Sequence, residues 1–278
     1  MTTSSWRGRA AVITGGASGI GLALATALAK CGAHVIVADL NAERAERAAA
    51  SLRALGHGAD ARALDVRDQG AVQALLDETV AAHGTVAIWA NCAGLAIAGE
   101  ARDLSLADWQ LVLDVNLRGT LHGSLAAYQQ MVRQGHGHLI NIASTYGLIP
   151  GGFNAPYITS KFGVVGLTES LRVEGADLGV KVLCVCPGFI RTPILTDSKA
   201  VNVSMGELMA KNPLPVASPE GLAAAILKAA ARDQGMLLWP DYVHWLHRLR
   251  YHAPGVLFRY LVRHTRQFRS LRRAPEAP

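Results

Sequence analysis

The stretch Thr14-Gly15-Gly16-Ala17-Ser18-Gly19-Ile20-Gly21 decides the fold of this chain. It follows a short apolar run, Ala10–Thr14, and it leads into an alanine- and leucine-rich segment that ends at Lys30. This order predicts a strand, a tight turn and a helix. Glycines in such a turn let backbone N–H groups approach a pyrophosphate, and the N-terminus of the helix adds a favourable dipole. The glycine spacing alone is a weak signal, but the flanking strand and helix strengthen it.

The same alternation of strand and helix patterns continues along the chain. We expect further strands at 34–38, 61–64, 86–91, 138–143, 180–186 and 236–239, and helices at 42–55, 69–82, 106–134, 156–178 and 219–232. Such alternation favours parallel pairing through right-handed crossovers. We therefore predict an α/β fold, a Rossmann-type doubly wound parallel sheet of about seven strands. The sheet and its helices form a single domain over 1–239, followed by a helical extension over 240–278.

Composition restricts the class of protein. The 278 residues, half of them hydrophobic, suit one large α/β domain. No apolar run reaches the roughly 18 residues of a membrane-spanning helix, and residues 1–9 lack the apolar stretch of a secretory signal. We therefore expect a cytoplasmic protein. The cysteines form no CxxC pair, so we expect free thiols and no metal site.

The charge of the chain is concentrated at its C-terminus. The net charge is +6, and the segment from Met236 onward holds eight arginines but only two acidic residues. The rest of the chain is neutral overall, so nucleic-acid binding is not expected. Apolar residues recur at helical spacing on both sides of Pro254-Gly255, as Tyr242, Trp245, Leu246 and Leu249, and then as Leu257, Leu261, Phe268 and Leu271. This basic amphipathic tail is expected to pack on the body or a neighbouring subunit, or else to lie peripherally on a membrane.

Asp39 ends the second expected strand, eighteen residues after Gly21. An acidic residue there can accept hydrogen bonds from the ribose hydroxyls of a bound dinucleotide and would repel a 2′-phosphate. The glycine turn contains no basic residue, and Leu40 follows Asp39. The sequence therefore favours NAD(H) over NADP(H). The alternative is that Asp39, beside Asn41, only caps the next helix.

Tyr157 and Lys161 are four residues apart on an expected helix and share one face. A tyrosine phenol normally titrates near pH ~10, and a nearby ammonium favours the phenolate. The pair is therefore suited to move a proton. Ser144 directly follows the fifth expected strand, 138–143, and its hydroxyl could hold a substrate oxygen there. A YxxxK pair alone is usually a solvated helix face, but here it follows the glycine turn, the acid and the serine in order.

These motifs together resemble the short-chain dehydrogenase/reductase family over about residues 6–239. The matching elements are TGGASGIG at 14–21, Asp65-Val66, Asn91-Cys92-Ala93-Gly94, Asn116 in VNLRG, Ser144 in NIAS, Tyr157-Ile-Thr-Ser-Lys161, and PGFIRT at 187–192. Cys92 departs from the family's usual Asn-Asn-Ala-Gly and could slightly weaken the hydrogen bonding of the central strand.

The resemblance implies roles for four catalytic residues. Tyr157 would be the acid/base on the alcohol or carbonyl oxygen. Lys161 would bind the nicotinamide ribose and lower the pKa of Tyr157. Ser144 would orient the substrate, and Asn116 would hold a water in a proton relay. The residues expected to bind NAD are Gly15, Ser18, Gly19, Ile20, Gly21, Asp39, Asp65, Val66, Asn91, Ala93, Gly94, Tyr157, Lys161, Pro187, Gly188, Ile190 and Thr192.

The resulting hypothesis is an NAD(H)-dependent oxidoreductase, an alcohol dehydrogenase or carbonyl reductase. Its substrate would be a lipophilic secondary alcohol, such as a steroid, an aryl carbinol or a fatty hydroxy compound, or the corresponding ketone. We expect the irregular segment 187–219 to form a substrate lid. The expected pocket residues are apolar apart from one amide: Leu95, Ala96, Leu148, Pro150, Phe153, Asn154, Ile194, Leu195, Met205, Leu208 and Met209. The same side chains could instead simply pack the lid.

Two other functions remain open at this point. One is a non-catalytic NAD(H)-binding sensor or scaffold, which the full catalytic set disfavours. The other is epimerase or dehydratase chemistry, which would usually need a larger C-terminal domain than the residues after Trp239 provide. The resemblance also implies a homo-oligomer, a tetramer or a dimer, assembled through the helices at 106–134 and 156–178.

Overall fold

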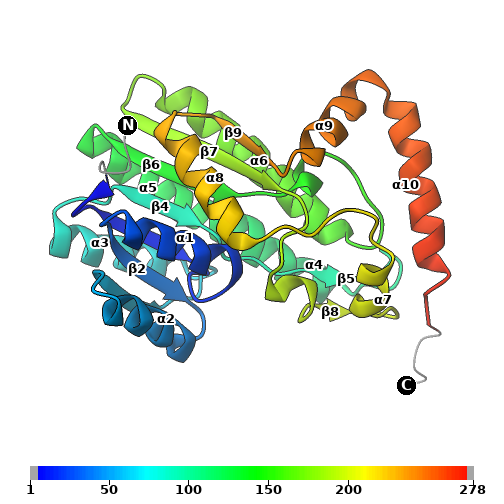
Figure 1. Ribbon diagram of the computed structural model, residues 1–278, viewed down its shortest axis with the longest axis horizontal. Coiled ribbons are helices and arrows are strands. Elements are labelled where there is room, and N and C mark those ends of the chain that lie inside the picture. Colours follow the sequence, from blue (N-terminus) through cyan, green and yellow to red (C-terminus); the bar gives the residue numbers. More distant parts are fainter. Residues whose placement is uncertain (1–5, 274–278) are drawn as a thin grey trace.

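The computed structural model describes residues 6–273. Its centre is a seven-stranded sheet in the order β3-β2-β1-β4-β6-β7-β9, with all neighbours parallel (Figure 1). The strands are β1 (Ala10–Thr14), β2 (His34–Asp39), β3 (Ala59–Ala63), β4 (Ile88–Asn91), β6 (Gly137–Ile142), β7 (Val180–Pro187) and β9 (Met236–Trp239). A separate two-stranded sheet joins β5 (Ile97–Ala98) to β8 (Lys199–Ala200). The predicted doubly wound α/β fold is confirmed.

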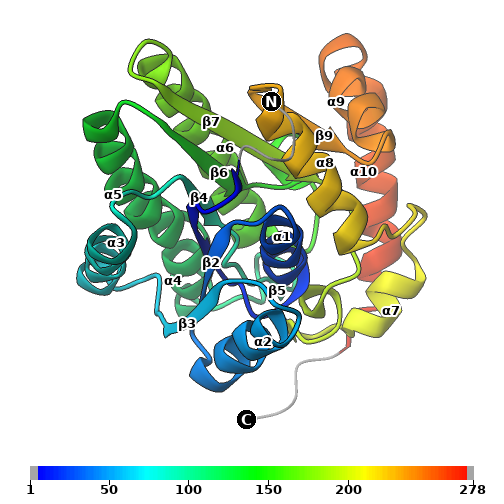
Figure 2. The same ribbon diagram turned by 60° about the vertical axis from the view of Figure 1, so that its left-hand side comes forward.

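Helices cover both faces of the sheet (Figures 1 and 2). One layer contains α1 (Gly19–Lys30), α2 (Ala42–Ala54) and α8 (Pro219–Ala231). The other contains α3 (Gln69–His83), α4 (Leu106–Leu113), α5 (Gly119–Gln134) and α6 (Ala155–Gly175). Strands buried on both faces read as continuous apolar runs, and β1 is buried along its whole length. Two apolar cores result, one on each side of the sheet.

The expectation that 106–134 is long and mostly helical is confirmed, with one feature that the sequence did not indicate. A π-helical turn, η2 (Asp114–Arg118), separates α4 from α5. The strand expected at 86–91 begins only at Ile88. The strand expected at 61–64 is β3, which begins and ends earlier, at Ala59 and Ala63. The segment expected to be an irregular lid contains a short helix, α7 (Met205–Ala210), besides β8. In the structure β8 pairs with β5, and Leu208 of α7 packs with Phe153.

The basic tail forms two helices, α9 (Tyr242–His252) and α10 (Pro254–Arg269). Their inner apolar stripe packs on the body, because Val243 and Leu257 are fully buried against the core beside β7. Two ion pairs also fasten the end of the tail to the segment between β5 and α4: Arg269 with Glu100, and Arg272 with Asp103. Among the described residues, no helix is both long and apolar enough to span a bilayer.

Candidate active site

The carboxyl ends of β1, β4, β6 and β7 bring the predicted site segments to one edge of the sheet. The glycine turn follows β1, Asn91 ends β4, Ser144 follows β6, and Pro187 ends β7. Helix α6 presents Tyr157 and Lys161 to the same edge, since Lys161 bonds to the last residue of β6. Ligands of open parallel sheets bind at this edge.

The glycine turn has the backbone geometry of a phosphate cradle. Gly15 and Gly19 have φ angles of 63° and 51°, in the left-handed region that glycine tolerates best. A Cβ at Gly21 would lie 2.2 Å from the Gly15 carbonyl oxygen, so no larger residue fits there. Ser18 is the N-cap of α1, but its side chain makes no capping hydrogen bond. The first N–H groups of α1 are thus available to an anion, which fits a dinucleotide.

Asp39 lies beside this turn. One carboxylate oxygen accepts a hydrogen bond from the Ala17 N–H at 3.2 Å, and the other accepts one from the Asn41 N–H at 3.1 Å. The cap of α2 is Asn41, whose side chain accepts from the Arg44 N–H at 2.8 Å. The geometry therefore disfavours the reading of Asp39 as only a helix cap.

Asp65 and Val66 follow β3, and Val66 contacts the start of α5. Asp65 forms an ion pair with Arg67 at 2.6 Å, and the hydrogen bond from Arg67 lowers the pKa of its carboxyl. Val66 packs so closely on Gly119 that a Cβ there would lie 2.5 Å from its Cγ2. Arg67 was not singled out from the sequence, because a charge next to an acid on a loop gives no distinguishing signal.

Lys161 is buried at the centre of the site. Its Nζ donates to the Ile142 carbonyl at 2.7 Å and lies 5.5 Å from the centre of the Tyr157 ring. Burial lowers the pKa of Lys161 to about 8, because the ammonium has lost its water. The site thus holds a cation whose charge changes near neutral pH.

The lowering of the Tyr157 pKa by Lys161, which the resemblance implies, stays a prediction. Burial raises the pKa of Tyr157, and only its hydrogen bond with Ser144 lowers it. Desolvation disfavours the phenolate more than these neighbours favour it. The same hydrogen bond places the Ser144 and Tyr157 hydroxyls together. Ser144 Oγ also accepts from the Tyr146 N–H at 3.1 Å, which fixes its orientation.

Asn116 occupies the π-helical turn and is fully buried. Its amide makes a matched pair of 2.9 Å hydrogen bonds with Leu95, accepting from the N–H and donating to the carbonyl. An ideal Cβ at Gly94 would lie 3.3 Å from Asn116 Oδ1 and 3.8 Å from Lys161 Nζ. Both groups therefore face Gly94. π-Helical turns of this kind often occur at functional sites.

The contact of Asn91 with the cofactor stays a prediction, and the structure shows that this last residue of β4 is buried. Its side chain accepts from Trp89 Nε1 at 2.9 Å and donates to Asn141 Oδ1 at 2.8 Å and to Ser124 Oγ at 3.2 Å. This buried network continues from Asn141 to Thr168. It ties β4 and β6 to α5 and α6, and it supports the site from behind. The sequence did not predict this network, because each of its polar residues stands alone within an apolar segment.

The segment after β7 is held by the tail. The Phe189 N–H donates to the Tyr242 hydroxyl oxygen at 2.7 Å, and the Gly188 N–H donates to the Trp239 carbonyl at 2.8 Å. Ile190 is buried, and Thr192 contacts the Gly19 position of the glycine turn. The predicted residues Pro187 to Thr192 therefore run from the end of β7 to the N-terminus of α1. The role of Tyr242 could not be found from the sequence, since it lies about fifty positions further along the chain.

The lid side of the site is hollow. A cavity of about 330 Å³ is lined by Arg191, Thr192, Leu195, Thr196, Gly206 and Met209. Of the other expected pocket residues, Ala96, Leu148, Phe153 and Leu208 are buried. Phe153 meets Phe268 of α10 edge to face, with ring centres 6.0 Å apart. The tail thus forms part of the apolar surroundings of the lid.

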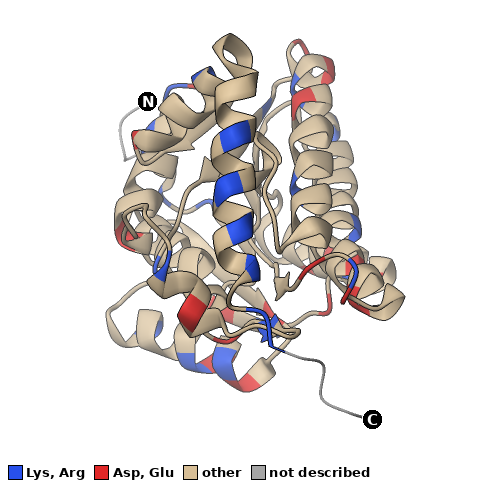
Figure 3. Ribbon diagram, turned by 90° about the vertical axis from the view of Figure 1, so that its right-hand side faces the viewer, with Lys and Arg blue, Asp and Glu red and all other residues tan. Residues whose placement is uncertain are grey.

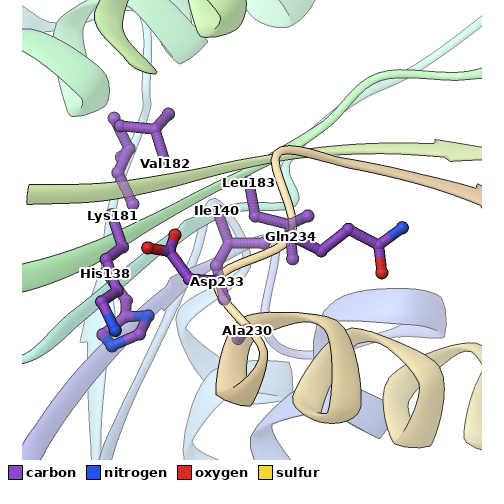
Figure 4. A pocket seen from close by; sticks show the side chains of 9 residues that line it. His138, Ile140, Lys181, Val182, Leu183, Ala230, Asp233 and Gln234 are labelled. Atoms are coloured by element: carbon purple, nitrogen blue, oxygen red, sulfur yellow. The ribbon is translucent and has the colours of Figure 1, made fainter. Parts of the chain in front are cut away.

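Two clusters of titratable groups lie away from this edge. Figure 4 shows His138, Lys181 and Asp233 around a small crevice, with His138 and Lys181 near the amino-terminal ends of β6 and β7. His34, Asp60 and His83 offer possible metal-ligand atoms within 4.8 Å of one another, and His34 already bonds to Asp60 at 2.8 Å. None of these residues belongs to the predicted site.

Known proteins share both the sequence pattern and the architecture. A family model described as short chain dehydrogenase matches residues 9–202. The chain belongs to this family. Members of the short-chain dehydrogenase family are oxidoreductases, and the Rossmann-type sheet described above is the fold of its solved relatives.

Two curated relatives illustrate the range of substrates. The chain is 35% identical to (2S)-[(R)-hydroxy(phenyl)methyl]succinyl-CoA dehydrogenase subunit BbsD of Thauera aromatica, over 82% of this chain and 92% of that protein. It is 36% identical to D-threitol dehydrogenase of Mycolicibacterium smegmatis, over 85% and 91% of the two chains. A short-chain type dehydrogenase/reductase from Mycobacterium marinum superposes with a TM-score of 0.77 at 29% identity, over 85% and 95% of the two chains. Both curated relatives are named as dehydrogenases of hydroxyl compounds.

Proposed function

We propose that this short-chain dehydrogenase interconverts a lipophilic secondary alcohol and its ketone with NAD(H). One observation carries the proposal: Tyr157, Ser144 and Lys161 lie together at the sheet edge where the glycine turn opens α1. A nicotinamide cofactor held at this edge would supply the hydride acceptor for oxidation of the alcohol, or the hydride donor for reduction of the ketone. The complete set disfavours a purely sensing or scaffold role.

The chain's own residues manage the proton and the substrate oxygen. Tyr157 takes the hydroxyl proton in oxidation and gives it back in reduction, while Ser144 donates a hydrogen bond to the same oxygen. Lys161 provides positive charge beside the Tyr157 phenol. Asn116 holds the backbone of Leu95 through two hydrogen bonds. In this proposal Asn116 also positions a water that connects Lys161 to solvent.

The cofactor proposal rests on Asp39. Its carboxylate is fixed beside the Ala17 N–H of the glycine turn, where it would accept hydrogen bonds from the adenosine ribose. A 2′-phosphate at that place would meet a negative charge, so NAD(H) is favoured over NADP(H). We assign the rest of the cofactor surface to the glycine turn, to Asp65 and Val66, and to the segment from Pro187 to Thr192. Asn91 supports the surface from within the core.

Replacing Asp39 with alanine tests the cofactor assignment. We expect the affinity of Asp39→Ala for NADH to fall by about tenfold, while that for NADPH rises, because the repulsion is removed. The ratio of the two dissociation constants, from fluorescence titration, is the measurement. Asp77→Ala, which removes an exposed carboxylate from α3, is the matched control and should keep the wild-type ratio. An unchanged ratio in Asp39→Ala would refute the NAD assignment.

The substrate proposal rests on the apolar surroundings of the lid. Leu195 and Met209 line the cavity, and Leu208 of the lid packs with Phe153 in a buried apolar cluster. A steroid, an aryl carbinol or a fatty hydroxy compound would bury apolar area there. One relative is named for a phenyl-bearing substrate and another for a small polyol, so a substrate panel must include both kinds.

We also propose that the enzyme is a homo-oligomer, a dimer or a tetramer. The long helices α5 and α6 leave large apolar side chains in solvent, Leu125 and Val173, the latter 78% exposed. Such side chains on adjacent helices suit a two-fold interface between copies of the chain. Light scattering at several protein concentrations measures the state directly.

A further inference from the structure

The outer surface of the tail is unlike the rest of the molecule. Four aromatic side chains, Trp245, Tyr251, Phe258 and Tyr260, are between 43% and 68% exposed. Two of them, Tyr251 and Phe258, flank the corner where α9 meets α10. In Figure 1 this corner stands at the upper right, at the margin of the molecule. Exposed aromatic side chains at such a projection indicate contact with a further surface.

A row of arginines runs along α10. Arg259, Arg263 and Arg266 recur at helical spacing and are all exposed. Figure 3 shows blue bands on successive turns of α10, facing the viewer. Within the described residues these three arginines make no salt bridge, whereas Arg269 and Arg272 of the same segment do. The tail therefore divides its arginines between an inner set that fastens it to the body and an outer row left to solvent.

The charge of this surface selects its partner. No Asp or Glu occurs between residues 242 and 273. A second copy docked about a two-fold axis would bring two arginine rows together, which like-charge repulsion opposes. Tryptophan, tyrosine and phenylalanine beside basic residues are typical of segments that lie in the interface of an anionic membrane.

We propose that the outer surface of α9 and α10 docks on an anionic lipid bilayer. The arginine row lies against the headgroups, and Trp245, Tyr251 and Phe258 enter the boundary between headgroups and acyl chains. The inner face of α10 meets the lid where Phe268 packs against the cluster that contains Val203 and Leu208. If the substrate is lipophilic, as the proposed function holds, docking would place the lid near the phase in which that substrate dissolves.

Vesicle flotation of the full-length protein tests the proposal without any activity assay. We expect binding to vesicles that contain phosphatidylglycerol, little binding to pure phosphatidylcholine, and release at high salt. The triple variant Arg259→Glu, Arg263→Glu, Arg266→Glu should bind at least about tenfold more weakly. Trp245→Phe should lose most of the blue shift in tryptophan emission that vesicles produce in the wild-type protein.

A matched control has the same change in net charge elsewhere on the surface. Arg44, Arg133 and Arg232 are exposed, lie on other helices or at their ends, and make no salt bridge in the described part of the chain. Their triple change to glutamate should leave vesicle binding within about twofold of wild type. Equal losses in both variants would reduce the effect to net charge and overturn the proposal.

Three other outcomes would also overturn it. One is the absence of flotation with anionic vesicles. A second is a shift to a smaller oligomer in the α10 variant, since the surface would then join two copies of the chain. The third is displacement from vesicles by duplex DNA at equal charge concentration, which would indicate a general polyanion site. Because the readout is binding, failure here leaves the proposed enzymatic function untouched.

Discussion

Lys161 is the residue at which function and stability oppose each other. It is almost fully buried, and burial lowers its pKa from 10.5 to about 8. Between these two pH values the unfolded chain holds a proton that the folded chain has released. Stability therefore rises with pH across this window, and the full penalty is present below about pH 8. The fold tolerates the penalty at the place where the proposed chemistry needs a cation.

Removing that ammonium should stabilise the protein while inactivating it. We expect Lys161→Met to raise the free energy of unfolding near neutral pH by about 1 to 3 kcal/mol. The loss of the hydrogen bond to the Ile142 carbonyl offsets part of this gain. The gain should shrink as the pH rises above about 8 and disappear above about 11, where the lysine is neutral in both the folded and the unfolded chain. Urea unfolding at several pH values measures it. Lys228→Met, at an exposed position on α8, should show no such pH dependence, and a destabilised Lys161→Met would contradict the account.

At the scale of elements, the glycine turn depends on one close contact between α1 and the chain just before it. Gly21 lies in the first turn of α1, where a Cβ would be 2.2 Å from the Gly15 carbonyl oxygen. Gly166 also lies in a helix, α6, but has nothing within 4 Å of its Cβ position. Both glycines lie in helices, but a side chain has no space at Gly21 and has open space at Gly166.

Alanine at these two positions should therefore change stability in opposite directions. Gly21→Ala forces the turn open and should cost about 1 to 3 kcal/mol, with a weaker affinity for NADH. Gly166→Ala should gain up to about 1 kcal/mol from the higher helix propensity of alanine. Urea unfolding and NADH titration of both variants give the comparison. Equal affinity for NADH in Gly21→Ala would show that the turn does not bind the dinucleotide.

Elements also show what could be predicted from sequence. The order of strands and helices follows from apolar runs broken by glycine and proline, and parallel pairing then brings Ser144, Asn91 and the glycine turn to one edge. The π-helical turn at Asn116 was missed, because one extra residue hardly changes the apolar periodicity of a long helix. The network from Asn91 to Asn141 was missed because it joins residues fifty positions apart.

At the scale of the whole molecule, the tail completes the site of the body. The Tyr242 hydroxyl accepts the Phe189 N–H, and a Cβ at Gly188 would lie 2.0 Å from that hydroxyl. Arg250 reaches the Leu148 carbonyl beside the lid. Together with the ion pairs to Glu100 and Asp103, these bonds join the tail to three segments of the body: those after β6 and β7, and the one between β5 and α4. We propose that 240–278 is an extension of the catalytic domain rather than an independent unit.

Removing the Tyr242 hydroxyl group tests whether the tail supports the segment after β7. Tyr242→Phe leaves the Phe189 N–H without its partner and should cost about 1 to 2 kcal/mol of folding free energy. The segment after β7 should loosen, so KM for both substrates should rise more than kcat falls. Tyr251→Phe, at a site 68% exposed in the same helix, is the matched control and should be neutral. Unchanged kinetics and stability in Tyr242→Phe would mean that the tail only rests on the body.

The most direct test of the central claim is the rate of NAD reduction by the wild-type protein and by Tyr157→Phe, over steroid, aryl, aliphatic and polyol alcohols. We predict turnover by the wild type with at least one bulky apolar class, faster with NAD than with NADP. Tyr157→Phe should lose at least about a hundredfold in rate while still binding NADH. Tyr146→Phe, which alters another buried phenol near the site, should keep most of the wild-type kcat. A Tyr157→Phe variant with the wild-type rate would contradict the mechanism, and silence with every alcohol despite intact NADH binding would contradict the proposed reaction.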